Sequence, residues 1–208
     1  MATTAGDLGG LLARARSGDE AGFLGLWRAL QPPLLRYLHV LGCDDADDDA
    51  GETWLQVVRD LHKFAGDDED FRRWLFTVAR HRAIDSARAR IRRRVSPMAG
   101  GLDGFADEQM VEDEVLDGMS VKKAVAMLAG LSPDQAEAVA LRVIAGLDTP
   151  SVASILGKSP GAVRVALHRG LRALAADPRV QALAADHGSG LPGQAPGLLA
   201  PPLGRRTE

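Results

Sequence analysis

Apolar residues recur along most of this chain with the three- and four-residue spacing of amphipathic helices, and no segment has the alternation of a half-buried strand. Asp19 is a suitable N-cap for the first of these helices, which Pro32 and Pro33 are expected to kink or break. In the first half of the chain the apolar faces run from Phe23 to Leu41, from Trp54 through Val57, Val58 and Leu61 to Phe64, and from Phe71 to Ile91. The pattern predicts an all-α protein.

The second half of the chain holds a separate helical block. The periodicity fails from Val95 to Gly118, where glycine is frequent, and it resumes near Val121. Ser132, Pro133 and Gln135 have the order of an N-cap, a first-turn proline and a capping-box residue. The apolar face that follows is expected to comprise Val139, Ala140, Val143 and Ile144.

Two short helices joined by a tight turn complete this block. Thr149 and Pro150 begin the first helix, Gly157 ends it, and Ser159 and Pro160 begin the second. This is the layout of a helix-turn-helix, whose second helix enters the major groove of duplex DNA. Its inward face is expected to hold Val163, Leu167, Leu171 and Leu174.

These patterns divide the chain into two small helical domains joined by a flexible acidic linker. The expected organisation is an N-terminal extension (residues 1–17), a first domain (18–95), the acidic linker (96–118), a second domain (119–176) and a Pro/Gly-rich tail (177–208). The composition of the tail predicts disorder, because it cannot bury enough apolar surface to offset the entropy of folding.

Charge is segregated along the chain. Residues 44–70 carry eleven acidic residues against two basic ones, and residues 72–94 carry nine arginines against one aspartate. Residues 95–118 then carry seven acids and no base, and residues 158–172 carry four bases and no acid. Arginine offers a planar fork to phosphates, and aromatic residues beside arginines suit the binding of unstacked bases. The sequence therefore predicts two DNA-binding helices.

Composition excludes several other classes of protein. Cys43 is the single cysteine, so an intramolecular disulfide and a Cys-rich metal site are excluded. The first residues lack the pattern of a signal peptide, and no stretch approaches the ~18 apolar residues of a membrane span. We therefore expect a cytoplasmic protein.

The motifs together resemble the sigma-70 family of bacterial RNA polymerase specificity subunits, in particular the extracytoplasmic-function (ECF) group, over residues 18–176. The run Asp45-Ala46-Asp47-Asp48 with Glu52-Thr53-Trp54 is similar to the polymerase-binding segment of region 2. Residues 71–85 and the arginines beyond them are similar to the promoter-melting and −10 segments. Residues 131–133, Gly157 and residues 163–171 are similar to region 4.

The resemblance implies a transcription initiation factor with no enzymatic activity. Such a factor binds promoter DNA, and it binds core RNA polymerase through the β′ clamp helices and the β flap of the polymerase. An anti-sigma factor is a further partner that the group implies. The implied polymerase-binding residues are Asp45, Asp47, Asp48, Glu52 and Trp54. The residues implied to recognise and melt the −10 element are Arg72, Arg73, Trp74, Phe76, Arg80, Arg82, Asp85 and Arg88. The loop of residues 65–70 is implied to assist them. For the −35 element they are Lys158, Ser159, Gly161, Arg164, Val165, His168, Arg169 and Arg172.

Three positions depart from the family pattern. Asp49 and Gly51 stand where an apolar residue and a glutamine are usual, and Ala166 stands where many members have a basic residue. The tail from residue 177 has no counterpart in the minimal two-region layout.

Two alternative functions each explain part of the sequence. The acidic cluster could bind a metal ion in an enzyme, but the EF-hand positions for glycine and glutamate hold Ala50 and Gln56, and the five histidines lack ligand spacing. The sequence therefore predicts no catalytic residue, metal site or cofactor. An operator-binding regulator would need only the helix-turn-helix, which leaves the first arginine block and the acidic linker unexplained. Such a regulator would bind duplex DNA alone, whereas a sigma factor would need core polymerase.

Overall fold

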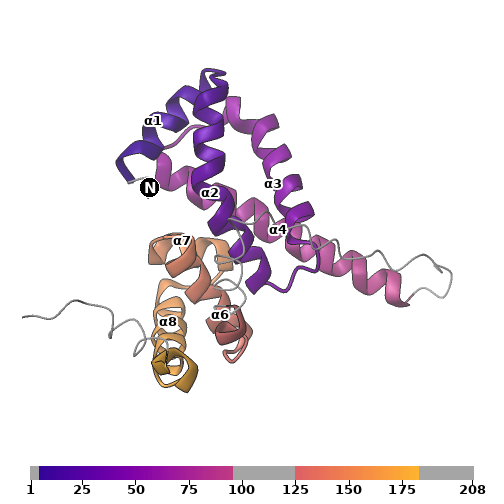
Figure 1. The fold of residues 1–208 in the computed structure, drawn as a ribbon, viewed down its shortest axis with the longest axis vertical. Helices are drawn as coiled ribbons and strands as arrows, with labels where there is room; N and C mark the ends of the chain where they lie inside the picture. The colour runs from indigo at the N-terminus through magenta and orange to yellow at the C-terminus, as the bar shows by residue number, and fades with distance from the viewer. Residues whose placement is uncertain (1–4, 96–124, 183–208) are drawn as a thin grey trace, which may run out of the picture.

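The computed structural model describes residues 5–95 and 125–182 (Figure 1). All regular structure within these ranges is helical, as the periodicity predicts, and it forms an N-terminal unit (residues 5–95) and a C-terminal unit (residues 125–182). The predicted acidic linker and most of the predicted tail lie outside the described residues. No helix in the described parts of the chain is both long and apolar enough to span a membrane.

The N-terminal unit consists of α1 (Ala5–Arg16), α2 (Glu20–Val40), α3 (Ala46–Asp60), the 3-10 turn η1 (Leu61–Lys63) and α4 (Asp68–Val95). Asp19 caps α2 as predicted, because its carboxylate accepts a hydrogen bond from the backbone nitrogen of Ala21 at 2.9 Å. The sequence analysis did not identify α1, which packs along α2 and buries Leu8 and Leu12.

Helix α2 continues through Pro32 and Pro33, so it does not break there, and a kink at the prolines stays a prediction. A proline inside a helix costs about 3 kcal/mol, because it removes a backbone donor and crowds the preceding turn. Full burial of one leucine contributes about 1.5–3 kcal/mol. The prolines are therefore offset by a fully buried stripe on the same helix, formed by Leu26, Leu30, Leu34 and Leu38.

The C-terminal unit consists of α6 (Pro133–Val139), the π-helix η3 (Ala140–Ile144), α7 (Thr149–Leu156) and α8 (Pro160–Ala175). Ser132 is the N-cap residue and Pro133 lies in the first turn of α6, as predicted, but the serine side chain makes no capping hydrogen bond. Beyond α8, Asp177 begins another short turn of helix at residues 178–182, where the sequence predicted an irregular tail.

The π-helix changes which residues of the C-terminal unit are buried. The backbone nitrogen of Ala145 donates to the carbonyl oxygen of Ala140 at 3.1 Å, a five-residue step that widens the turn. Leu141 is consequently fully buried and Val143 is 62% exposed, so the prediction that Val143 lies in the core was wrong. A sequence pattern with a period of 3.6 residues cannot foresee this change of register.

Four other apolar residues of the predicted faces are exposed, namely Trp27, Val58, Ile91 and Leu171. Val58 lies outside the stripe by which α3 packs on α2 and α4, and Leu171 lies beside the position where α8 crosses α6. That crossing is formed by Gly170 instead, which is buried; an added Cβ would lie only 2.9 Å from Cγ2 of Val139. The two helices therefore approach too closely for a larger residue at Gly170.

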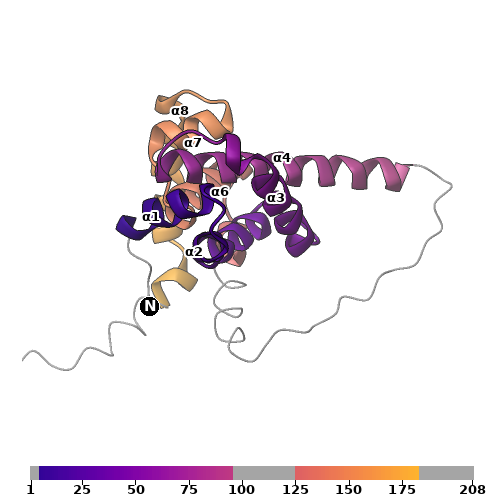
Figure 2. The same ribbon diagram turned by 90° about the horizontal axis from the view of Figure 1, so that it is seen from above.

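The two units pack against each other. Helix α2 contacts α6 and η3, helix α4 contacts α7, and the buried apolar residues of both units form one continuous cluster. Figure 2 shows α7 and α8 lying over the first half of α4, while the second half of α4 extends away from the C-terminal unit. The start of α4, where the sequence places the melting residues, thus faces the C-terminal unit.

Candidate nucleic-acid and polymerase interfaces

The helix-turn-helix predicted from the sequence is present as α7 and α8. Asp148 caps α7 by accepting from the backbone nitrogen of Ser151 at 2.8 Å. Hydrogen bonding by the side chain and then the backbone of Ser151 lowers the pKa of the Asp148 carboxyl group. Gly157 ends α7 in the left-handed conformation, with φ of 63°, which favours glycine. Ser159 caps α8, and Val163 is fully buried against the other helices.

Helix α8 presents a continuous exposed face on the side opposite Val163. Seven of the eight residues predicted to contact the −35 element are exposed, namely Ser159, Gly161, Arg164, Val165, His168, Arg169 and Arg172. Lys158 is partly exposed and forms an ion pair with Asp134 of α6. The face includes the first turn of α8, so it combines basic side chains with the positive end of the helix dipole.

Aromatic residues and arginines lie together near the start of α4, directly after its acidic first turn. Trp74 is half-buried and stacks on Phe64, with ring centroids 5.2 Å apart and an interplanar angle of 19°. The two rings lie at an open pocket of about 310 Å³, whose lining residues are Phe64, Ala65, Asp70, Arg73, Trp74, Thr77 and Ser154. The structure thus brings Trp74 together with the loop of residues 65–70. Ser154, which α7 contributes, was not anticipated.

Phe76 is a core residue, and the prediction that it contacts DNA was wrong. Its side chain is fully buried and meets Tyr37 edge to face, with ring centroids 5.4 Å apart. Successive helical residues are about 100° apart, so Phe76 points almost opposite to Trp74. The sequence placed two aromatics near the arginines but could not show which of them faced solvent.

The arginines at the start of α4 are held by specific partners. Arg73 pairs with Asp70 at 2.5 Å, and Arg82 donates to Oε1 of Gln56 at 3.0 Å. Arg72 donates to the carbonyl oxygen of Ala145, and Arg80 pairs with Glu137 at 2.7 Å, so these two bind the C-terminal unit. Farther along the helix, the predicted residues Asp85 and Arg88 form an exposed pair at 3.5 Å.

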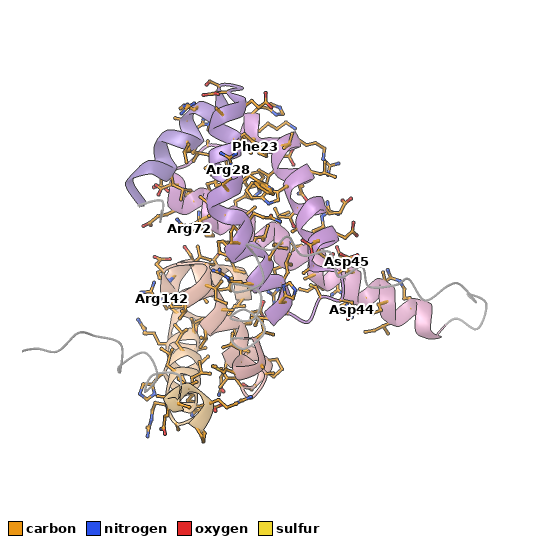
Figure 3. All side chains as sticks on the ribbon, viewed as in Figure 1. Phe23, Arg28, Asp44, Asp45, Arg72 and Arg142 are labelled. Carbon is orange, nitrogen blue, oxygen red and sulfur yellow. The ribbon has the colours of Figure 1, made fainter. Side chains whose placement is uncertain are left out.

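The acidic residues predicted to bind the polymerase lie at the start of α3. Asp45 is the N-cap and accepts from the backbone nitrogen of Asp48 at 2.9 Å, while Asp47, Asp48 and Glu52 are exposed. Figure 3 shows Asp44 and Asp45 at the end of α3 that lies beside α4. The exposed carboxylates of Asp47, Asp48 and Glu52 lie along the first half of α3 and make its surface negatively charged.

Trp54, also predicted to bind the polymerase, is instead part of the core. It is only 6% exposed, its indole nitrogen donates to Oε1 of Gln31 at 2.7 Å, and its ring meets Phe23 edge to face. Asp49, a departure from the family pattern, is buried and accepts from Oγ of Ser86 at 2.5 Å. Trp54 and Asp49 therefore orient the exposed acids of α3 without forming part of their surface.

The lone cysteine has no features of a reactive thiol. Burial and a hydrogen bond with Asp49 raise the pKa of Cys43 to about 12, so the group stays protonated at neutral pH. In the described residues no group of three or more His, Cys, Asp or Glu side chains is arranged to hold a metal ion.

Known family models match both units of the chain. Residues 26–94 match the model for Sigma-70 region 2, and residues 117–174 match the model for Sigma-70, region 4. The chain is 32% identical over 170 residues to the ECF RNA polymerase sigma factor BldN of Streptomyces coelicolor, covering 79% of this chain and 63% of that protein. It is 32% identical over 179 residues to ECF RNA polymerase sigma factor ShbA of Streptomyces griseus, covering 81% and 94%.

The fold also has solved counterparts. The sigma factor RpoE of Bartonella quintana, crystallised with the anti-sigma factor NepR, matches with a TM-score of 0.52 and 20% identity, over 73% of this chain and 93% of that one. At that identity the match supports the fold alone. The two family models and the two Streptomyces relatives show that this chain belongs to the sigma-70 family, in the ECF group of RNA polymerase sigma factors.

Proposed function

We propose that this chain docks on core RNA polymerase through the exposed acids of α3, recognises the −35 element with α8 and separates the −10 strands with the start of α4. The observation that carries the proposal is the occurrence, in one chain of this family, of an exposed basic helix-turn-helix face and a separate aromatic pocket that Arg73 helps to line. No residue acts as a catalyst, because strand opening is driven by the free energy of binding the separated strand.

On the −35 element, the exposed face of α8 provides both kinds of contact that duplex recognition needs. Arg164 and His168 lie in the part of the helix that enters the major groove, and Val165 offers an apolar contact to a thymine methyl group. The other residues of the face hold the phosphates and fix the register of the helix.

On the −10 element, the pocket beside Trp74 is suited to an extruded base. Six of its seven lining residues, all except Ser154, belong to the N-terminal unit. Trp74 supplies a face for stacking, and Arg73 supplies charge for the adjoining phosphate. A base enters this pocket only once it has left the duplex, so its capture favours the open strands.

Two further statements follow from the family. A protein with this function acts on RNA polymerase and therefore in the cytoplasm. Because RpoE of Bartonella quintana was solved with an anti-sigma factor, we also propose that a protein of that kind binds this chain.

The deciding experiment is transcription in vitro with core polymerase and genomic DNA, followed by mapping of the start sites. We expect initiation at a set of promoters that share −35 and −10 elements, and initiation only when the chain is present. Specific binding of duplex DNA by the chain alone, with no change in polymerase initiation, would show an operator-binding regulator instead.

Substituting Arg164 by alanine is expected to weaken recognition at one −35 base pair by about 1–3 kcal/mol, if its guanidinium makes a bidentate contact to a base. The measurement is transcription from promoters substituted singly at each −35 position. Arg172→Ala is the matched control: it should weaken all promoters equally and reduce the salt dependence of binding by about one phosphate contact. Unchanged selectivity of the Arg164 variant would refute a base-reading role.

Substituting Trp74 by alanine is expected to reduce strand opening by about 1–3 kcal/mol, the contribution of stacking one base. Permanganate reactivity of unpaired thymines, normalised to bound holoenzyme, measures this effect. Trp74→Phe should retain most of the opening, and Trp27→Ala, which removes an exposed indole from α2, should retain all of it. Equal losses for the Trp74 and Trp27 variants would exclude a specific role for the pocket.

A further inference from the structure

Glu137 lies at the centre of the contact between the two units. Its Oε1 accepts one hydrogen bond from the hydroxyl of Tyr37 at 3.0 Å and another from Nε of Arg80 at 2.7 Å. Both partners belong to the N-terminal unit, whereas Glu137 belongs to α6 of the C-terminal unit. The side chains of Arg80 and Glu137 are only 25% and 15% exposed, so water screens their attraction weakly.

The surroundings of Tyr37 reinforce this cluster. Burial, together with the nearby charge of Glu137, raises the pKa of Tyr37 well above its usual value, so its hydroxyl remains a donor at neutral pH. Burial lowers the pKa of Arg80, but the hydrogen bond to Glu137, the charge of Glu137 and the nearby Tyr37 together outweigh it, so the pKa of the guanidinium is raised. Tyr37 and Arg80 therefore keep the protonated forms that these hydrogen bonds require.

Other contacts of the same interface cover the proposed −10 surface. Arg72 donates to the carbonyl oxygen of Ala145 at 3.3 Å, and Ser154 of α7 lines the pocket of Trp74. Figure 3 shows Arg72 on the side of the N-terminal unit that faces Arg142 and the rest of the C-terminal unit. In this arrangement the C-terminal unit occupies two arginines, and one wall of the pocket, that the −10 strand would use.

We propose that Glu137 is an autoinhibitory latch: it holds the free chain in a closed state in which the C-terminal unit masks the −10 surface, and the chain must open before that surface binds DNA. The proposal rests on the −10 function assigned above to the start of α4. The Glu137 carboxylate engages Arg80 as a phosphate oxygen would, through a charge-assisted hydrogen bond, so promoter DNA and Glu137 compete for the same guanidinium. When the chain opens and binds DNA, the Arg80 guanidinium exchanges the Glu137 carboxylate for a phosphate of the DNA backbone.

The latch is testable by double electron–electron resonance on the full-length chain, with spin labels at Arg28→Cys and Ala173→Cys in a Cys43→Ala background. Both labelled positions are exposed and lie in different units. We expect one narrow distance distribution for the otherwise unsubstituted chain. Glu137→Arg should broaden it and shift it to longer distances, and Tyr37→Phe, which removes a single hydroxyl, should do so to a smaller extent.

Two controls separate the latch from a general effect of charge. Asp134→Arg makes the same charge change on the same helix, but its partner Lys158 lies within the C-terminal unit, so the narrow distribution should persist. The double variant Arg80→Glu/Glu137→Arg restores an opposite-charge pair and should recover the narrow distance distribution. The latch is overturned if the unsubstituted chain is already broad, if Glu137→Arg leaves the distribution unchanged, or if Asp134→Arg opens the chain equally.

Masking is tested separately with a single-stranded oligonucleotide that carries the non-template −10 sequence of a mapped promoter. Fluorescence anisotropy should show that the free Glu137→Arg chain binds the strand at least about fivefold more tightly than the Asp134→Arg chain does. The reason is that a larger fraction of the Glu137→Arg chain is open. Equal affinities with an open Glu137→Arg chain would overturn masking and leave the latch intact. A second outcome would also count against masking: neither Glu137→Arg nor Asp134→Arg binds the strand, although transcription depends on Trp74. An open Glu137→Arg chain should expose the pocket of Trp74 and therefore bind the strand.

Discussion

Replacing Phe76 by alanine is expected to lower the free energy of unfolding by about 3–5 kcal/mol. The side chain is fully buried in the cluster that joins both units, and its edge-to-face contact with Tyr37 adds about 0.5–1.5 kcal/mol to the effect of burial. Removing the ring leaves a cavity that helices α2 and α4 cannot close without shifting. Urea unfolding of the full-length chain, followed by circular dichroism, measures the change.

The matched variants distinguish a core role from DNA contact. Phe76→Leu keeps most of the buried volume and should cost less than about half as much as Phe76→Ala. At a temperature where it remains folded, Phe76→Leu should open promoters as well as the unsubstituted chain. A Phe76→Ala chain of unchanged stability but defective in strand opening would contradict the structure and favour the interpretation made from sequence alone.

Reversing Asp47 and Asp48 together to lysine is expected to weaken binding to core polymerase about a hundredfold, or about 2.7 kcal/mol. Both carboxylates are exposed in the first turn of α3, and their reversal would place two cations against a partner surface that we propose to be basic. Binding is measured by titrating fluorescently labelled chain with core polymerase at two salt concentrations, because electrostatic docking weakens as salt is added.

The control for this double reversal must include its effect on helix stability. Lysines in a first turn interact unfavourably with the helix dipole, at about 0.3–1 kcal/mol each. Asp68→Lys/Glu69→Lys makes the same charge change in the first turn of α4, away from the face of α3. If that control loses as much polymerase affinity as the Asp47/Asp48 reversal, docking through α3 is refuted and the loss reflects overall charge.

Local sequence features predicted most of the secondary structure correctly. Asp19 and Ser159 cap the helices that follow them, and Gly157 adopts the left-handed conformation that ends α7. These features depend on residues within one turn of each other, so the sequence contains all the information they require. Most of the exposed face of α8 was predictable for the same reason, since a buried Val163 sets the direction of the side chains near it; Leu171, farther along the helix, is exposed although its spacing predicted burial.

The sequence by itself therefore determined the helices, their caps, the helix-turn-helix and the segregation of charge. Only the tertiary structure decided which of two neighbouring aromatics is core, that Trp54 is buried, and that a π-turn exposes Val143. The pairing of Glu137 with Arg80 and Tyr37 joins residues 57 and 100 positions apart. Such contacts depend on how whole helices cross, and the spacing of residues within one helix does not contain that information.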